Sequence, residues 1–383
     1  MHTLSLHDAL PIFLVFLKYK FKKMERKIEL IKFLPIRYAD PITSLELTDN
    51  YLCFGSMLGL LECFIISSNK LKKLSEKQDE FISGIILRKN DLYACIGDLK
   101  IIKYTFDPEN IDSNPEKTEI NNYKDVKIHQ DNCEQCLTLM NNNYLIRNLI
   151  AFPKSPEEQP IEKDVKFFIK NIFKESVEND FVGNSKLSNY CVPFDFDGKN
   201  YIIIDFKEKT KRIFYVYDVI LKDMKINKEI ETIKENSIGH ISHLKIIKDD
   251  MIFIVQDYNK CEIRQFNLEL VKKLNIQSNE ILAFDMLFEN QENALEYSNE
   301  RNVNEKEIKK IVILDIECNV ILYDYKEDKS ELLFNLEKSE LQGIDNDIRD
   351  QRFFMFGYPY YIKISENYIA ISSDYGVILI KYN

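Results

Sequence analysis

The chain has 383 residues, a formal net charge of −10 and a pI of about 5.3. An acidic chain lacks the basic surface that phosphate backbones select, so we expect no binding to nucleic acid or to anionic membranes. Its 8 cysteines come without a secretory signal or a membrane-spanning apolar run, which predicts reduced thiols in the cytoplasm or the nucleus.

Residues 1–23 are predicted to be a leader that does not belong to the folded domain. Their apolar run, 9–17, precedes the lysines, which is the reverse of a secretory signal, and it is much shorter than the roughly 20 residues that cross a bilayer. Residues 3–12, TLSLHDALPI, resemble the translation of a common sequencing adapter. We therefore expect the native chain to start at Met24.

A repeated pattern organises the predicted domain, which covers residues 24–383. In each copy apolar residues alternate, two or more residues of the Asn, Asp, Gly or Lys type follow, and a second apolar run comes next. Alternation indicates a strand with one buried face, and Asn and Asp tolerate tight turns, so each copy predicts a β-hairpin. Clear copies begin at Leu45, Ile85, Leu137, Phe194, Leu244 and Ile362.

A third strand follows the hairpin in several copies, as in LLECFII, which ends at Ile66. Successive copies begin 40 to 57 residues apart as far as Leu244, and a degraded copy at 281–325 fills the long interval before Ile362. Seven units result, and four short strands in about 40–50 residues are typical of β-propeller blades. We predict an all-β, seven-bladed β-propeller. Six or eight blades, or a pair of β-sandwiches, are the alternatives.

The two ends of the domain are predicted to pair with each other. The last copy stops at its third strand, GVILIKYN, and the segment 26–34, RKIELIKFL, has the pattern of a strand without a partner in its own unit. Unpaired strand edges invite aggregation. Pairing this N-terminal strand in the last blade would protect both edges and close the ring.

Two units resemble the WD-repeat family. In the fifth unit Gly239 and His240 precede the innermost strand, Asp257 stands at the turn before the third strand, and Phe266 replaces the family's Trp. In the last unit Asp374 stands at the corresponding turn. The resemblance implies a divergent WD-repeat-like propeller in which His240 and Asp257 form the structural hydrogen bond of the family.

Some stretches have too few apolar residues to pack. The predicted insertions lie near 107–125, 153–181 and 290–310. Within the second insertion, residues 164–177 carry apolar side chains at helical spacing, which favours a short helix packed on a blade. An outer strand is the alternative for this segment.

The sequence predicts neither catalysis nor a metal centre, so we expect a protein that is not an enzyme and holds no cofactor. His129, Cys133 and Cys136 have ligand-like spacing, but zinc requires a fourth ligand and no second Cys-x-x-Cys follows. There is no nucleophile elbow and no glycine-rich phosphate loop. The innermost strands supply a mixed set of charges without an acid–base pair, namely Glu46, Asp195, Lys245 and Lys363.

Protein binding is the remaining class of function, because a propeller presents loops at one face of a rigid ring. In a WD-repeat-like topology the loops before the innermost strands and between the second and third strands share that face. Ring closure would bring the first and last blades together there, with Tyr and Arg side chains of the kind that dominate interface hot spots. The predicted contact residues are Arg37, Tyr38, Asp40, Ser56, Met57, Phe356, Tyr358, Tyr360, Asp374 and Tyr375.

We therefore expect a non-catalytic scaffold for protein partners in an intracellular complex, monomeric outside that complex. A substrate receptor of a ubiquitin ligase is one alternative. It is weakened because the Trp-Asp-x-Arg box of such propellers cannot occur in a chain without Trp. A propeller hydrolase is the other alternative, and a metal or a polar cluster in the central channel would distinguish it.

Overall fold

The computed structural model of the chain places the strands of the domain and parts of the connections between them. The described residues are 28–36, 40–75, 81–97, 100–107, 110, 113–122, 135–141, 144–150, 163–171, 181–187, 194–196, 200–208, 211–218, 226–232, 241–248, 251–289, 307–336, 360–373 and 376–382. Every regular element among them is a β-strand, which confirms the all-β prediction.

The described strands form seven four-stranded antiparallel sheets, and six of these sheets follow the chain without a crossover. The first three sheets comprise β2 (Ile42–Leu47), β3 (Tyr51–Ser56), β4 (Leu61–Ile65) and β5 (Lys70–Ser75); β6 (Ile82–Arg88), β7 (Asp91–Ile96), β8 (Lys100–Thr105) and β9 (Glu116–Asn122); and β10 (Gln135–Asn141), β11 (Tyr144–Ile150), β12 (Lys163–Asn171) and β13 (Phe181–Leu187).

The next three sheets repeat the same meander. They comprise β14 (Phe194–Phe196), β15 (Asn200–Glu208), β16 (Lys211–Asp218) and β17 (Ile226–Thr232); β18 (Ile241–Lys248), β19 (Met251–Gln256), β20 (Lys260–Gln265) and β21 (Leu270–Lys273); and β22 (Ile281–Phe288), β23 (Ile308–Asp315), β24 (Asn319–Asp324) and β25 (Lys329–Asn335). The predicted hairpins of these six sheets are thereby confirmed, including the degraded copy that supplies β22 to β24.

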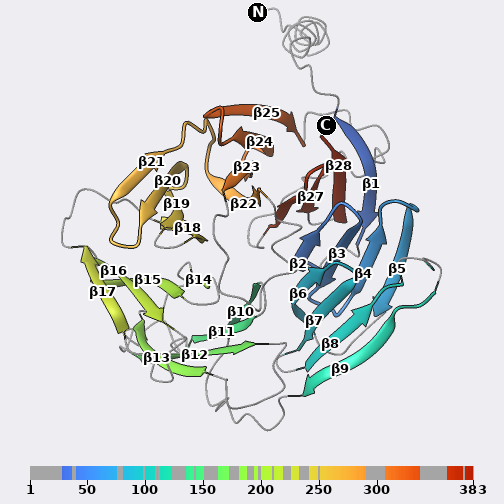
Figure 1. Cartoon of the computed structure of the whole chain (residues 1–383), viewed down its shortest axis with the longest axis horizontal. Helices are drawn as coiled ribbons and strands as arrows, with labels where there is room; N and C mark the ends of the chain where they lie inside the picture. Colours follow the sequence, from blue (N-terminus) through green and yellow to red (C-terminus); the bar gives the residue numbers. More distant parts are fainter. Residues whose placement is uncertain are drawn as a thin grey trace, which may run out of the picture.

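The last sheet combines the two ends of the domain. It contains β26 (Ile362–Ile364), β27 (Tyr368–Ser373) and β28 (Gly376–Lys381), and β1 (Glu29–Pro35) pairs antiparallel with β28. The register runs from Glu29 opposite Lys381 to Pro35 opposite Gly376. Figure 1 shows the sheets arranged around a common centre, with β1 beside β28, so the architecture is propeller-like.

The segment predicted as a short helix, 164–177, instead contributes strand β12, so that prediction was wrong. Strand β12 pairs with β11 on one side and with β13 on the other. Two ladders satisfy the backbone of this segment, and its adjacent Phe167, Phe168 and Ile169 are residue types that favour strands. Strand β9 likewise lies within the predicted insertion at 107–125.

The core lies between neighbouring sheets. Leu34, Val377 and Leu379 of the last sheet pack in one cluster with Leu45 and Phe54 of the first sheet. Further clusters join the first sheet to the second, the fifth to the sixth, and the sixth to the seventh. Because apolar burial stabilises a fold by about 25 cal/mol per Å², these inter-sheet layers hold the sheets in fixed positions and make a rigid base for the connecting turns.

The turns of the sheets gather at two ends of the molecule. At one end the chain leads into each innermost strand and later turns from the second strand to the third; we call this end the lead-in face. The other turns form the opposite face. Hydrogen bonds between neighbouring sheets place their lead-in ends side by side. The backbone N–H of Ile281, at the start of β22, donates to the carbonyl of Tyr258 in the β19–β20 turn at 2.7 Å. The hydroxyl of Thr43, near the start of β2, donates to the carbonyl of Ile82 at the start of β6.

Candidate functional site

Four of the predicted contact residues lie in the described part of the chain: Asp40, Ser56, Met57 and Tyr360. The other predicted contact residues lie outside the described residues, and so does His240. They are Arg37, Tyr38, Phe356, Tyr358, Asp374 and Tyr375. The structure therefore bears on one part of the predicted site, at the connections around β2, β3 and β26.

Asp40 and Ser56 build a turn from the inside. The Ser56 hydroxyl donates to Asp40 Oδ2 at 2.8 Å, and the backbone N–H of Leu58 donates to Asp40 Oδ1 at 2.8 Å. Ser56 Oγ in turn accepts the N–H of Leu60 at 3.0 Å. Asp40 is 5% exposed and Ser56 is 0% exposed, so these two side chains fix the β3–β4 turn from beneath and do not form its exposed tip.

The tip of that turn is apolar. Met57 and Leu58 are exposed, at 57% and 52%, whereas Tyr360 is half-buried against the core cluster between the sixth and seventh sheets. The prediction included Met57 and missed Leu58. The sequence signal for Leu58 was the pair of large apolar residues that follows Ser56 and precedes Gly59, a glycine with a φ of 83°.

Exposed apolar side chains are distributed unevenly over the described surface. Nine large ones are exposed there. Five lie on the lead-in face, in the β3–β4, β19–β20 and β23–β24 turns or just before β6: Met57, Leu58, Phe81, Tyr258 and Ile316. The other four lie on the outermost strands β5, β21 and β25: Leu71, Leu270, Val271 and Leu332. None of the nine lies in a described turn of the opposite face.

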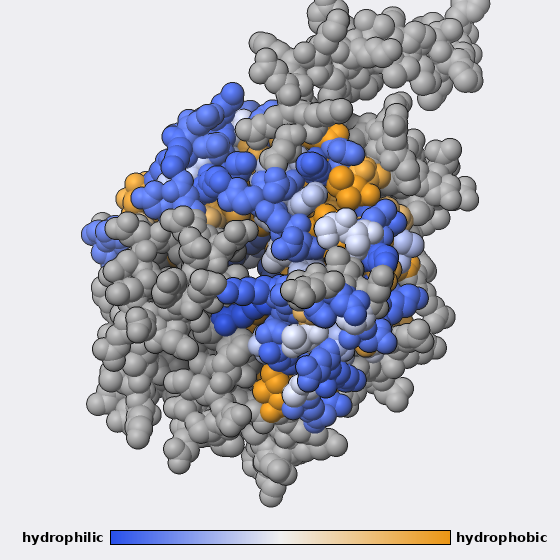
Figure 2. All heavy atoms as spheres, turned by 45° about the vertical axis from the view of Figure 1, so that its right-hand side comes forward, coloured by the Kyte–Doolittle hydropathy of each residue, from blue (hydrophilic) through white to orange (hydrophobic). Residues whose placement is uncertain are grey.

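The turns of the opposite face carry polar groups. Asp49 accepts hydrogen bonds from the Ser365 hydroxyl at 2.7 Å and from the backbone and side-chain nitrogens of Asn367 at 3.1 Å, which joins the first sheet to the last. Figure 2, which shows one side of the molecule, displays a largely hydrophilic described surface on which apolar residues form separate patches. Among the described turns, exposed large apolar side chains thus occur on the lead-in face and not on the opposite face.

Charged residues of the innermost strands pair across neighbouring sheets. Lys363 Nζ lies 2.9 Å from Glu46 Oε1, and Lys245 Nζ lies 3.3 Å from Asp285 Oδ1. Burial by itself lowers the pKa of Lys363, but the carboxylates of Glu46 and Asp285 outweigh it and raise that pKa above its ordinary value. These four side chains are arranged as ion pairs that join one sheet to the next.

Two aspartates of the innermost strands also accept backbone hydrogen bonds from the following sheet. Asp195 Oδ2 accepts the N–H of Ile246 at 2.7 Å, and Asp285 Oδ2 accepts the N–H of Ile364 at 3.1 Å. Sequence analysis identified Asp195 and missed Asp285. The sequence signal for Asp285 was a single carboxylate in an otherwise apolar strand, ILAFDMLF.

Asp257 occupies the predicted turn between β19 and β20. Its backbone has a φ of 50°, and Lys260 Nζ lies 2.9 Å from its Oδ2. Because His240 lies outside the described residues, the bond between His240 and Asp257 stays a prediction. His243 of the same sheet reaches the next sheet, with its Nε2 3.2 Å from the carbonyl oxygen of Leu282.

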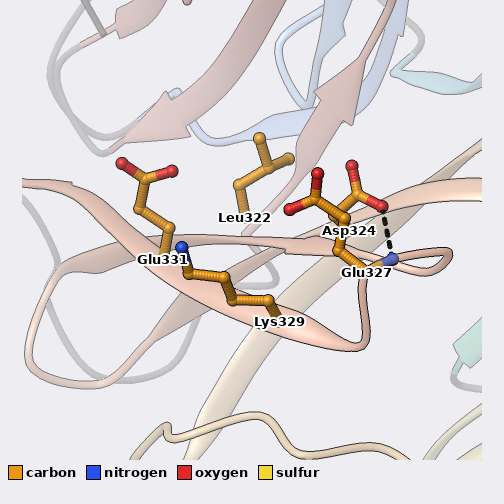
Figure 3. A pocket seen from close by; sticks show the side chains of 5 residues that line it. All are labelled: Leu322, Asp324, Glu327, Lys329 and Glu331. Atoms are coloured by element: carbon orange, nitrogen blue, oxygen red, sulfur yellow. Dashed lines mark hydrogen bonds between the residues drawn. The ribbon is translucent and has the colours of Figure 1, made fainter. Parts of the chain in front are cut away.

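A shallow polar pocket lies on the outer hairpin of β24 and β25 (Figure 3). Its lining consists of Leu322, Asp324, Glu327, Lys329 and Glu331. Asp324 Oδ1 accepts the backbone N–H of Glu327 at 3.1 Å, so this carboxylate forms part of the turn. Among the described residues no group of three or more His, Cys, Asp or Glu side chains is placed to hold a metal ion. Of the predicted ligand-like cluster, His129 and Cys133 lie outside those residues.

Within the described residues the structure has no helix long and apolar enough to span a membrane.

Comparison with known proteins supports the fold. No family model matches the chain, and no curated protein sequence matches it. Among solved structures, the WD40 β-propeller domain of Doa1 is similar with a TM-score of 0.52 at 9% identity, over 94% of this chain and 97% of that domain. A computationally designed protein, Ika8, matches over 93% of this chain and 100% of its own at 10% identity, but its TM-score of 0.49 is too low to support a shared fold. The chain therefore has a propeller-like fold similar to that of a WD40 domain.

Proposed function

We propose that this chain is a non-catalytic protein-interaction scaffold, a seven-bladed WD-repeat-like propeller that binds partner proteins through its lead-in face. The seven four-stranded sheets among the described residues support the blade count. The pairing of β1 with β28 supports a ring closed in the last blade, because it joins the two ends of the domain in one sheet.

The placement of exposed apolar side chains carries the choice of face. Large apolar groups in water are unfavourable, and aromatic residues and Met are enriched in the buried centres of protein interfaces. On the described turns such groups occur at the lead-in face and are absent from the opposite face. Because the turns rest on packed sheets, little conformational freedom would be lost on binding.

The remaining predicted contact residues belong to the proposed site because they stand in connections that lead to the same face. Arg37 and Tyr38 stand in the connection to β2, Phe356 and Tyr358 precede β26, and residues 374 and 375 join β27 to β28. All are connections of the lead-in type. The first and last blades would then supply aromatic and Arg anchors beside the apolar tip of the β3–β4 turn.

The absence of catalysis is part of the proposal, and the inner-strand ion pairs support it. A general acid or base needs a pKa matched to its task and contact with a substrate, whereas Lys363 and Lys245 face carboxylates of the neighbouring sheets. The proposed partners are proteins, in the cytoplasm or the nucleus, because the chain is acidic and its thiols are expected to be reduced.

The test is quantitative affinity purification with mass spectrometry from cells that express the tagged full chain. A variant with Met57→Asp and Leu58→Asp places two charges on the lead-in face. A control with Ser67→Asp and Asn69→Asp places two charges in the β4–β5 turn of the same sheet, on the opposite face, where both residues are exposed. We expect the first variant to lose most of the co-purified protein and the control to keep it.

Thermal melting of both variants would confirm that each still folds. If the two variants lose the same partners to the same degree, or if the control alone loses them, the proposed face is wrong. If a stably folded chain acquires no partner in any form, the scaffold function itself is wrong.

A further inference from the structure

Two cysteines face each other in the first sheet. Cys53 of β3 stands directly opposite Cys63 of β4 in the antiparallel register, and their Sγ atoms are 2.7 Å apart. Both side chains are 0% exposed and lie in the apolar cluster between the first and second sheets. Cys95, Cys261 and Cys318 are also buried, and none of them belongs to the first sheet.

This arrangement suits a covalent bond between the two sulfurs. Residues directly opposite in an antiparallel pair have Cα atoms about 4.5–5.5 Å apart, which lies within the range of about 4.4–6.8 Å found for disulfides. A disulfide needs the sulfurs at about 2.05 Å, so they must approach by only a fraction of an ångström from their present 2.7 Å. The register thus brings the two sulfurs within reach of a bond without a change of strand pairing.

We propose that Cys53 and Cys63 form a cross-strand disulfide when the protein meets a peroxide. The thiolate of one cysteine attacks an oxygen of hydrogen peroxide, the O–O bond breaks, and a sulfenic acid and hydroxide result. The second thiol attacks the sulfenic sulfur, the S–S bond forms, and the hydroxyl leaves as water with the thiol proton. Two thiols and one peroxide thus yield one disulfide and two waters.

The surroundings of the pair set its rate. Burial raises the pKa of Cys53 well above its ordinary value, and the adjacent Cys63 and Glu46 raise it further. Because the thiolate is the nucleophile and both side chains are buried, the pair reacts only when the sheet opens locally. The proposed disulfide is therefore a slow modification that persists once formed, in contrast to a fast peroxide sensor.

The bond would also constrain the turn between its two strands. The chain between Cys53 and Cys63 contains the β3–β4 turn, with Met57 and Leu58 at its tip. A disulfide at the base of this hairpin would reduce the opening of the turn without covering its tip. This chemistry does not depend on the proposed scaffold function.

The test maps thiols in the full chain after exposure to increasing hydrogen peroxide, followed by unfolding and alkylation. Trypsin leaves both cysteines in one peptide, 38–70, because no Lys or Arg stands between Arg37 and Lys70. We expect this peptide to lose the mass of two hydrogens and to escape alkylation. Cleavage after Glu62 should leave its two halves joined until a reductant is added.

Matched variants separate this pair from the other buried thiols. Cys63→Ser should abolish the mass loss, and Cys95→Ser, which alters an equally buried cysteine in β7, should leave it intact. The unaltered chain decides the matter even if a variant does not fold. Cys53 and Cys63 that stay alkylatable after prolonged exposure to peroxide, long enough for the backbone amides of β3 and β4 to exchange, or that link preferentially to other cysteines, would overturn the proposal.

Discussion

The lead-in face and the opposite face are built from the same strands, yet their turns are stabilised in different ways. On the lead-in face, buried carboxylates accept the backbone N–H groups of the turn, as Asp40 does for Leu58 and Asp315 does for Glu317 and Asn319. On the opposite face the acceptors include half-buried residues of the turns. Thr48, for example, accepts the N–H of Tyr51 at 3.1 Å.

This difference explains why the lead-in tips can be apolar. Where a carboxylate beneath the turn satisfies the backbone, the tip residues need no polar side chain of their own, and positions such as Leu58 and Ile316 are free to be exposed apolar residues. Where the acceptors lie nearer the surface, the turn itself carries polar residues such as Thr48 and Asp49. Turn chemistry therefore decides where these turns can expose apolar side chains.

The strongest expected effect concerns the carboxylate beneath the β23–β24 turn. Asp315 is 1% exposed and accepts four hydrogen bonds, from the backbone of Asn279, Glu317 and Asn319 and from the Asn319 side chain. Asp315→Ala removes all four hydrogen bonds to a buried charged acceptor at once, so we expect the free energy of unfolding to fall by about 3 kcal/mol, measured by urea denaturation.

The matched control on the opposite face is Asp49→Ala, since Asp49 accepts three hydrogen bonds and is half-buried. Water can replace part of what is lost there, so a smaller loss of about 1 kcal/mol is expected. Equal losses at Asp315 and Asp49 would show that the two faces are not stabilised differently.

A second substitution, at Gly376, tests the pairing of β1 with β28 at its lead-in end. A Cβ atom at Gly376 would overlap the backbone carbonyl of Leu34 in β1. Gly376→Ala should therefore push β1 away from β28 and lower the free energy of unfolding by about 2 kcal/mol. Hydrogen exchange should show faster exchange in β1, and Lys381→Ala at the other end of this ladder should leave that exchange unchanged.

A third prediction concerns the ion pairs that join the innermost strands of neighbouring sheets, midway between the two faces. Their contribution to stability depends on pH. The pKa of Lys363 is raised in the folded state, so its contribution to stability is complete below the unfolded pKa of about 10.4 and is lost as the pH rises through the higher folded value. Lys363→Met should lower stability by about 1 kcal/mol at neutral pH, because the pair is about a quarter exposed.

The readout for Lys363 is stability measured from pH 9 upward in the parent and in the variant. The difference in free energy of unfolding between the parent and the variant should disappear as Lys363 of the parent deprotonates. A difference that is constant across this range would mean that the ammonium charge does not supply the stabilisation.

The smallest expected effect on stability is at the apolar tip itself. Leu58 is 52% exposed, so Leu58→Ser should change the free energy of unfolding by less than about 0.5 kcal/mol, while partner binding falls. Thermal melting and affinity purification on the same samples measure both. A large loss of stability would show that Leu58 packs within its own sheet and is not a contact residue.

Much of the fold could be predicted because the hairpins are encoded locally. At Leu45 and Ile85 the alternation, the polar turn and the second apolar run are all complete, and the strands begin and end within a few residues of the pattern. Strand β12 could not be predicted in this way. Its apolar residues fit a helix as well as a strand, and its two neighbouring strands, which decide between them, come from other parts of the chain.

The site was harder to predict than the fold. Sequence position placed Met57, Asp40 and Ser56 among the predicted contact residues, but it could not tell that Asp40 and Ser56 point inward and hold the β3–β4 turn. A polar residue in a turn can face a partner or its own backbone, and only the arrangement of donors distinguishes the two. Asp285 was missed because its backbone donor, Ile364, lies far away in the sequence.

The pairing of β1 with β28 has a mechanical consequence. Because the strands are antiparallel, Glu29 at the start of β1 lies opposite Lys381 near the end of β28. A force that separates the two chain ends therefore acts on one end of the ladder and opens its hydrogen bonds one after another, as a zipper opens. Pulled by its ends in a single-molecule experiment, the molecule should yield at low force and release β1 first.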